Sequence, residues 1–164
     1  MAKKFETVFN TTIDEKNQGI LLEQYKIYVE SANLTSSLRG QANTFFLTIN
    51  TILVSFLVGI LEFSIRATIY YWTIFGCLAG VLLCVSWYFL LRSYRSLNSG
   101  RFAVIHELEK ELPARIYARE WEIVVTKASP NKGKYIRQTY IEQIIPIAFA
   151  ILYFVLALSH MLVN

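Results

Sequence analysis

The chain has 164 residues, 54% of them hydrophobic and 17% charged, and a formal net charge of +4 at pH 7. This length suits one domain, and the apolar fraction is above that of soluble globular proteins. Two cysteines and two histidines do not support a disulfide framework or a zinc site, so no cofactor is expected. The modest positive charge fits segments that lie beside anionic lipid, and no nucleic-acid partner is expected.

Residues 1–42 form a polar N-terminal segment with a predicted amphipathic helix. From Gly19 onward an apolar stripe that begins with Ile20 and Leu21 recurs at helical spacing, with charged residues on the other side. Only Gly40 separates this pattern from the first apolar run, so we expect one helix to continue into it. The segment is too polar for a signal peptide, and the first apolar run is therefore expected to be an uncleaved anchor.

Three apolar runs follow, at residues 43–63, 69–91 and 144–163. Each has about 20 residues, which is enough to cross a hydrocarbon core ~30 Å thick. A soluble helix of this length would interrupt its apolar residues with charges, and the first two runs are almost free of them. The sequence therefore predicts an all-α integral membrane protein with three transmembrane helices and short helices in the 92–143 region between the second and third.

Lysine and arginine predict the orientation. Residues 1–42 carry five of them and residues 92–143 carry ten, whereas the link between the first two spans carries only Arg66. The positive-inside rule places both charged segments in the cytoplasm. We therefore expect an inner-membrane protein whose C-terminus is external, with the 62–68 link as a tight external turn.

Hydroxylated and small residues recur at steps of three or four along the first span: Thr44, Thr48, Thr51, Ser55 and Gly59. At about 100° per residue they share one face, and Asn43 and Asn50 form a second polar stripe beside it. An amide in hydrocarbon is costly, so Asn50 is expected to face protein or water. Three explanations of the hydroxylated face stay open: packing against the other spans, an interface between subunits, or a water-filled path. The opposite side is suited to lipid and holds Phe46, Ile49, Leu53, Phe56 and Ile60.

The second span contains Gly76 and Gly80, a small-xxx-small pattern that marks a close helix approach. Cys77 and Cys84 share one face of this span and are expected to be apolar fillers. Aromatic residues near its cytoplasmic end, Trp87 among them, are expected to lie at the membrane interface.

The 92–143 region is predicted to form short helices. A break at 98–100 precedes an apolar helical face that ends at Pro113, and a second helix is expected over 115–125. A turn at 129–133 and a helix from 135 into the last span complete the region. Short amphipathic helices bury little surface alone, so they are expected to pack on the N-terminal helix, the membrane face or a neighbouring subunit.

The chemistry of the polar residues does not predict an enzyme. His106-Glu107-Leu108-Glu109 lacks the second histidine of a zincin, because position 110 is lysine, and its acidic residues are expected to form a solvated face. Glu142, just before the last span, is expected to be an interfacial anchor, with a gate or a subunit contact as the alternative. An enzyme acting on lipid would have to use Glu142 with His106. We expect no catalytic residue, no metal site and no small-molecule substrate.

Several stretches together resemble the RipA family of octameric bacterial membrane proteins: residues 25–32, 39–51, 100–113, 120–121 and 140–146. Their order and spacing around three spans carry the resemblance, which covers residues 20–160. It implies a homo-octamer in the inner membrane with no assigned catalysis. It also marks Arg39, Asn43, Asn50, Glu109, Pro113, Trp121 and Glu142 as candidate structural or assembly positions.

The leading hypothesis is a non-enzymatic homo-oligomer that acts as a scaffold or as a factor in envelope adaptation to stress. Its partners would be other copies of the chain and membrane lipid. The rival hypothesis is a pore or channel, including the membrane effectors of antiphage defence. The candidate interface or pore-lining residues are Asn43, Thr44, Thr48, Asn50, Thr51, Ser55, Gly76 and Gly80.

Overall fold

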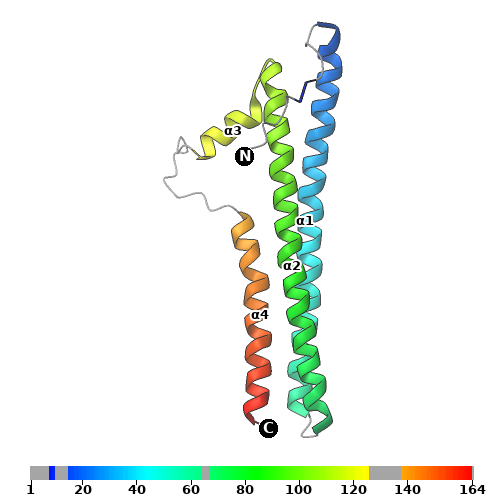
Figure 1. Cartoon of the computed structure of the whole chain (residues 1–164), viewed down its shortest axis with the longest axis vertical. Coiled ribbons are helices and arrows are strands. Elements are labelled where there is room, and N and C mark those ends of the chain that lie inside the picture. Colours follow the sequence, from blue (N-terminus) through cyan, green and yellow to red (C-terminus); the bar gives the residue numbers. More distant parts are fainter. Residues whose placement is uncertain (1–7, 10–14, 64–66, 126–137, 164) are drawn as a thin grey trace, which may run out of the picture. The chain divides into compact units, whose positions relative to one another are not determined.

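The computed structural model describes residues 8–9, 15–63, 67–125 and 138–163, and this part of the chain is helical apart from short connections (Figure 1). Three helices are long and apolar enough to cross a membrane, so the predicted all-α membrane fold is confirmed. The predicted turn at 129–133 and the centre of the link at 62–68 lie outside the described residues. The elements are α1 (Glu15–Phe63), α2 (Ala67–Leu108), the 3-10 turn η1 (Glu109–Glu111), α3 (Ile116–Val125) and α4 (Gln138–Val163).

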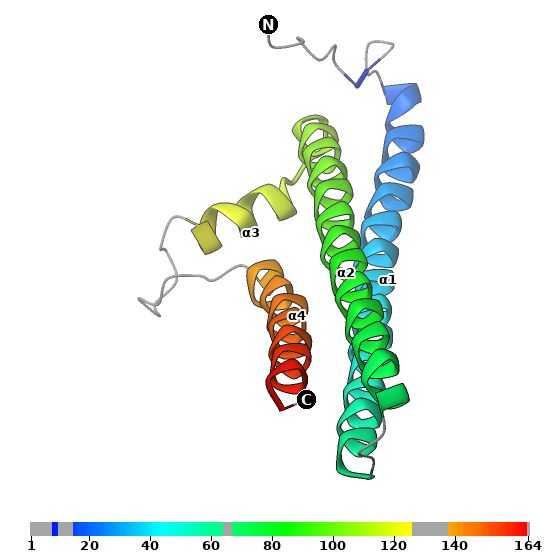
Figure 2. The ribbon, with the colours of Figure 1, turned by 60° about the horizontal axis from the view of Figure 1, so that its bottom comes forward.

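The chain divides into two compact units. The charged unit comprises Met1–Ser36 and Ser96–Tyr135, and the apolar unit comprises Ser37–Arg95 and Ile136–Asn164. Helices α1 and α2 contribute to both units and run side by side (Figures 1 and 2). Helix α1 continues through Gly40, where an added Cβ would meet open space, so the predicted continuous helix is confirmed.

The predicted break at residues 98–100 is wrong, because α2 is helical from Ala67 to Leu108. Glycine in a helix costs only about 1 kcal/mol relative to alanine. Packing beyond this point outweighs that cost: Ile105 is buried, and the Arg101 guanidinium donates to the Ser31 carbonyl and the Thr35 hydroxyl of α1. The helix ends before Pro113, as predicted.

Helices α1, α2 and α4 pack together in the apolar unit around Leu57, Cys77, Cys84 and Tyr153. Two contacts join α1 and α4, Arg39 with Glu142 and Asn50 with Tyr153. The interval along the chain is 103 residues in both contacts, so the two helices run parallel in one register. From the first contact to the second, each helix advances eleven residues. Eleven residues make close to three turns, so both contacts lie on the same face of each helix.

Candidate functional site

Asn50 is fully buried and joins all three helices of the apolar unit. Its Oδ1 accepts hydrogen bonds from the Tyr153 hydroxyl of α4 at 3.1 Å and from the Cys84 thiol of α2 at 3.4 Å. Its Nδ2 donates to the Phe46 carbonyl at 2.8 Å. An amide satisfied in this way is compatible with an apolar surrounding and holds the helices in one arrangement. Asn50 therefore faces protein of its own chain.

Gly76 and Gly80 admit neighbouring helices within the same chain. A Cβ at Gly80 would lie 2.4 Å from Cζ of Tyr153, and one at Gly76 would lie 2.6 Å from Cδ2 of Leu57. Neither distance is possible for real atoms, so these positions require glycine unless a neighbour moves. Helix α4 therefore packs closely on α2 at Gly80, and α1 packs closely on it at Gly76.

Trp87 is fully buried against other helices of its own chain, so it does not face lipid as a residue of an aromatic belt would. Its indole Nε1–H donates to Oδ1 of Asn43 at 3.2 Å, and its ring stacks on Phe46 with centroids 5.8 Å apart. Phe46 and Leu53, expected to face lipid, instead face the other helices of the unit. The expectation failed because this stretch of α1 also has other apolar residues, such as Phe45 and Ile52, and hydropathy alone does not say which of them meet another helix.

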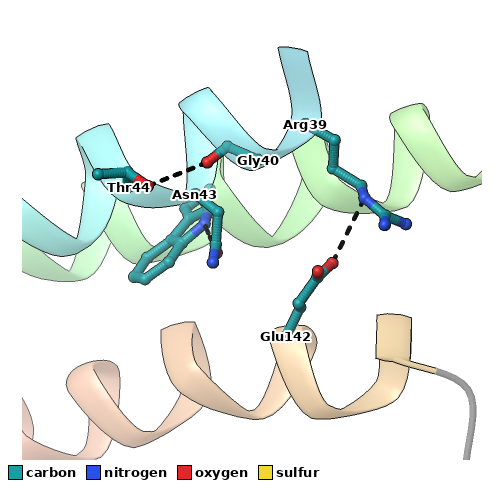
Figure 3. Close-up of polar contacts among 6 residues, drawn as sticks. Arg39, Gly40, Asn43, Thr44 and Glu142 are labelled. Atoms are coloured by element: carbon teal, nitrogen blue, oxygen red, sulfur yellow. Dashed lines mark hydrogen bonds and ion pairs between the residues drawn. The ribbon is translucent and has the colours of Figure 1, made fainter. Parts of the chain in front are cut away.

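Arg39 of α1 and Glu142 of α4 point toward each other as an ion pair (Figure 3), with Nε and Oε2 3.5 Å apart. The two side chains are only 18% and 12% exposed. A carboxylate and a guanidinium removed from water in this way stabilise each other chiefly because each would be costly alone. Glu142 therefore has a partner in its own chain, which the sequence did not reveal.

The hydroxyl stripe, defined as Thr44, Thr48, Thr51 and Ser55, stays exposed. Each hydroxyl donates to the backbone carbonyl four residues earlier, at 2.8–3.2 Å, as Figure 3 shows for Thr44 and Gly40. Each hydroxyl oxygen can still accept a hydrogen bond from another molecule. Packing against the other spans of the same chain, one of the three explanations, is thus wrong for these four residues. An interface between subunits and a water-filled path remain.

Helix α4 presents the opposite chemistry on its exposed side, because large apolar side chains cover it along its whole length. Such a surface is what hydrocarbon chains favour. The apolar unit therefore has one side suited to lipid, whereas on α1 the hydroxyl stripe is exposed beside apolar residues such as Phe45 and Ile52. The exposed apolar residues of α4 include Ile144, Ile147, Ile151, Phe154 and Leu158.

Glu109 is fully buried in the charged unit, so the solvated face predicted for it is wrong. Its two carboxylate oxygens accept from the backbone N–H groups of Tyr117 and Ala118, at 2.9 and 3.0 Å. The Tyr25 hydroxyl of α1 donates to the same carboxylate at 3.0 Å. A carboxylate at a helix start satisfies amides that lack an intrahelical acceptor. Glu109 thus fastens the beginning of α3 to α1.

Burial, followed by the hydrogen bond to the Glu109 carboxylate, raises the pKa of Tyr25 well above its ordinary value. Tyr25 lies before the first apolar run and remains a neutral donor to Glu109. His106 packs against the Phe102 ring, with centroids 6.3 Å apart. Among the described residues, no three histidine, cysteine or acidic side chains are grouped so that they could hold a metal ion. Pro113 and Trp121 lie on the exposed surface around α3.

Residues 22–162 match the octameric membrane protein family (8xMP). The chain belongs to this family. The match covers most of the sequence and both units, and it agrees with the resemblance at the level of an octameric membrane protein. Comparisons with curated proteins and with solved structures find no match.

The contacts and exposure in the structure divide most of the candidate residues into two sets. Those in the first set make contacts within one chain: Arg39, Asn43, Asn50, Gly76, Gly80, Glu109 and Glu142. The hydroxyl stripe forms the second set and remains available to other copies. The sequence did not indicate Tyr153 or Tyr25 as partners of the first set, because their contacts join segments far apart in the chain.

Proposed function

We propose that this protein is a non-enzymatic, homo-oligomeric scaffold of the bacterial inner membrane, in which a neighbouring copy covers the hydroxyl stripe of α1. The exposed position of this stripe is the observation that carries the proposal. Small hydroxylated side chains let membrane helices approach closely and accept hydrogen bonds across the contact. The apolar exposed side of α4 would face lipid in the same assembly.

The polar groups that the structure brings together support a structural role. Both oxygens of Glu109 bind amides of α3, and Glu142 pairs with Arg39. The alternative of a lipid-modifying enzyme would require Glu142 and His106 as a pair, yet each already has a contact in its own unit. The uneven distribution of lysine and arginine supports a cytoplasmic N-terminus and 92–143 region and an external C-terminus.

The mass of the purified protein in lipid nanodiscs tests the proposal. We expect a particle of about eight subunits of 18.9 kDa each. Thr48→Leu combined with Thr51→Leu fills the stripe with bulk and should shift the mass toward smaller species. Ile147→Leu combined with Ile151→Leu on α4 is the matched control and should leave the mass unchanged. A wild-type protein that is a single subunit would contradict the proposal.

A pore is the second candidate, and one further observation favours it. Exposed polar residues recur along α1 at steps of three or four residues in both units. Polar side chains along one helix face are what a wetted path requires. They are Glu23, Lys26, Glu30 and Asn33 in the charged unit, then Ser37, Gln41 and the hydroxyl stripe in the apolar unit.

Ion flux into liposomes tests the pore. A conducting path along the stripe predicts flux through the wild type that falls when Thr48→Leu narrows and dries it. Asn50 would be a poor choice for this test, because it is buried inside the chain and its replacement would disturb helix packing. Absence of flux from the wild-type particle would remove this candidate.

A further inference from the structure

The charged unit exposes apolar side chains on its part of α1, for which the proposed function gives a cytoplasmic location. Ile20, Ile27 and Leu34 follow one another at intervals of seven residues and are 59%, 61% and 60% exposed. Glu23, Lys26 and Glu30 are interspersed with them on the same helix. Residues seven apart lie almost above one another on a helix, so these three side chains form one exposed apolar stripe.

Helix α3 exposes a second apolar surface of the same spacing. Ile116 and Ile123 are also seven residues apart and are 65% and 39% exposed. Ile27 and Leu34 are therefore as far apart along α1 as Ile116 and Ile123 are along α3. Both separations are about 10 Å at ~1.5 Å per residue. Two side chains of one stripe can thus meet two of the other.

The charges beside the two stripes are complementary. Glu30 lies three residues after Ile27 and four before Leu34 on α1, and Arg119 lies three after Ile116 and four before Ile123 on α3. Opposite charges therefore occupy equivalent positions beside the two stripes. Arg119 pairs with Glu122 on the surface of its own helix, an exposed contact that contributes little and can be exchanged.

We infer that the Ile20/Ile27/Leu34 stripe of one copy docks on the Ile116/Ile123 surface of α3 in the next copy. The occupant is a second copy because the chain belongs to a family of octameric membrane proteins. A closed ring needs two different surfaces on each subunit that fit each other head to tail, and these two stripes meet that requirement. The inference rests on the proposed self-assembly and adds a contact in the charged unit.

Cysteine cross-linking tests the contact. With Ile27→Cys and Ile123→Cys in the same chain, a short water-soluble bismaleimide should give a ladder of covalent oligomers, because every subunit offers one thiol to each neighbour. Each single variant should give none, and the wild type should not react because Cys77 and Cys84 are buried. A dimer from Ile27→Cys alone would indicate an α1–α1 contact and overturn the inference. So would a double variant that forms no ladder although its particle is oligomeric.

Two neighbouring residues of α1 provide a second test. Leu34→Lys places a charge in the stripe, whereas Asn33→Lys places the same charge on an adjacent exposed position outside it. Native mass should fall toward smaller species for Leu34→Lys and stay at the wild-type value for Asn33→Lys. Equal masses for the two variants would overturn the docking. A wild-type particle that is itself a single subunit would instead overturn the proposed scaffold, so the two failures are distinguishable.

Discussion

In the apolar unit, buried polar side chains join one helix to another, as Asn50 does with Tyr153 and Arg39 does with Glu142. In the charged unit, buried Glu109 instead binds backbone amides at the start of α3. The exposed residues of α1 also differ: α1 exposes the hydroxyl stripe in the apolar unit, and Ile27 and Leu34 in the charged unit. Each unit thus exposes some side chains that differ in polarity from most of its residues. Surfaces of this kind are the ones that other protein molecules cover.

The largest effect within a subunit is expected at Arg39. Arg39→Ala leaves the Glu142 carboxylate largely removed from water without its cation, which should cost about 3 kcal/mol. The free energy of unfolding, measured by titration with denaturing detergent in mixed micelles, checks this value. Arg39→Lys keeps the charge and should lose much less. Equal losses for the two variants would contradict an ion pair as the source of the stability.

Close helix approach in the apolar unit is tested next. Gly80→Ala puts a methyl group 2.4 Å from the Tyr153 ring and should cost about 2 kcal/mol, because the ring must move. Gly59→Ala is the matched control, since a Cβ there meets open space. The same unfolding titration should show no loss for this control. A loss at Gly59 as large as at Gly80 would mean that helix packing is not the cause.

The two units show which features the sequence predicts and which it does not. The three spans and the continuity of α1 follow from hydropathy and spacing, which are local properties of the chain. Glu109 lies among charged residues in the sequence. It is buried because α3 and Tyr25, which lies 84 positions earlier, contact its carboxylate. Gly76 and Gly80 predicted a close approach, but the identity of the approaching helix depends on the tertiary arrangement. The burial of Trp87 against Phe46 likewise depends on the tertiary arrangement.

The charged unit is tested at Glu109. Glu109→Ala removes the acceptor for the first amides of α3 and should cost about 1 kcal/mol, the usual value of a helix cap. Hydrogen exchange at the amides of Tyr117 and Ala118 should become faster, while exchange in α4 stays unchanged. Unchanged protection at both amides would show that the carboxylate does not hold α3.

The smallest effect is expected at the buried hydrogen bond of the apolar unit. Tyr153→Phe keeps the ring against Gly80 and removes only the hydroxyl that donates to Asn50. The loss should be about 0.6 kcal/mol, the average for hydrogen bonds between membrane helices. Tyr153→Leu in the same unfolding titration should lose more, because it also empties the core. If Tyr153→Phe lost more free energy of unfolding than Gly80→Ala, hydrogen bonding would contribute more than packing, which contradicts the expected order.

In the proposed assembly, another copy covers the hydroxyl stripe of α1. A nitroxide label at Thr48→Cys in the assembled particle tests it directly, with Cys77→Ala and Cys84→Ser so that position 84 still donates to Asn50. We expect low collision rates with both oxygen, which dissolves in lipid, and a water-soluble nickel chelate. A label at Phe154→Cys on α4 should collide readily with oxygen. High oxygen accessibility at position 48 would contradict the claim, and high nickel accessibility would establish the water-filled path in its place.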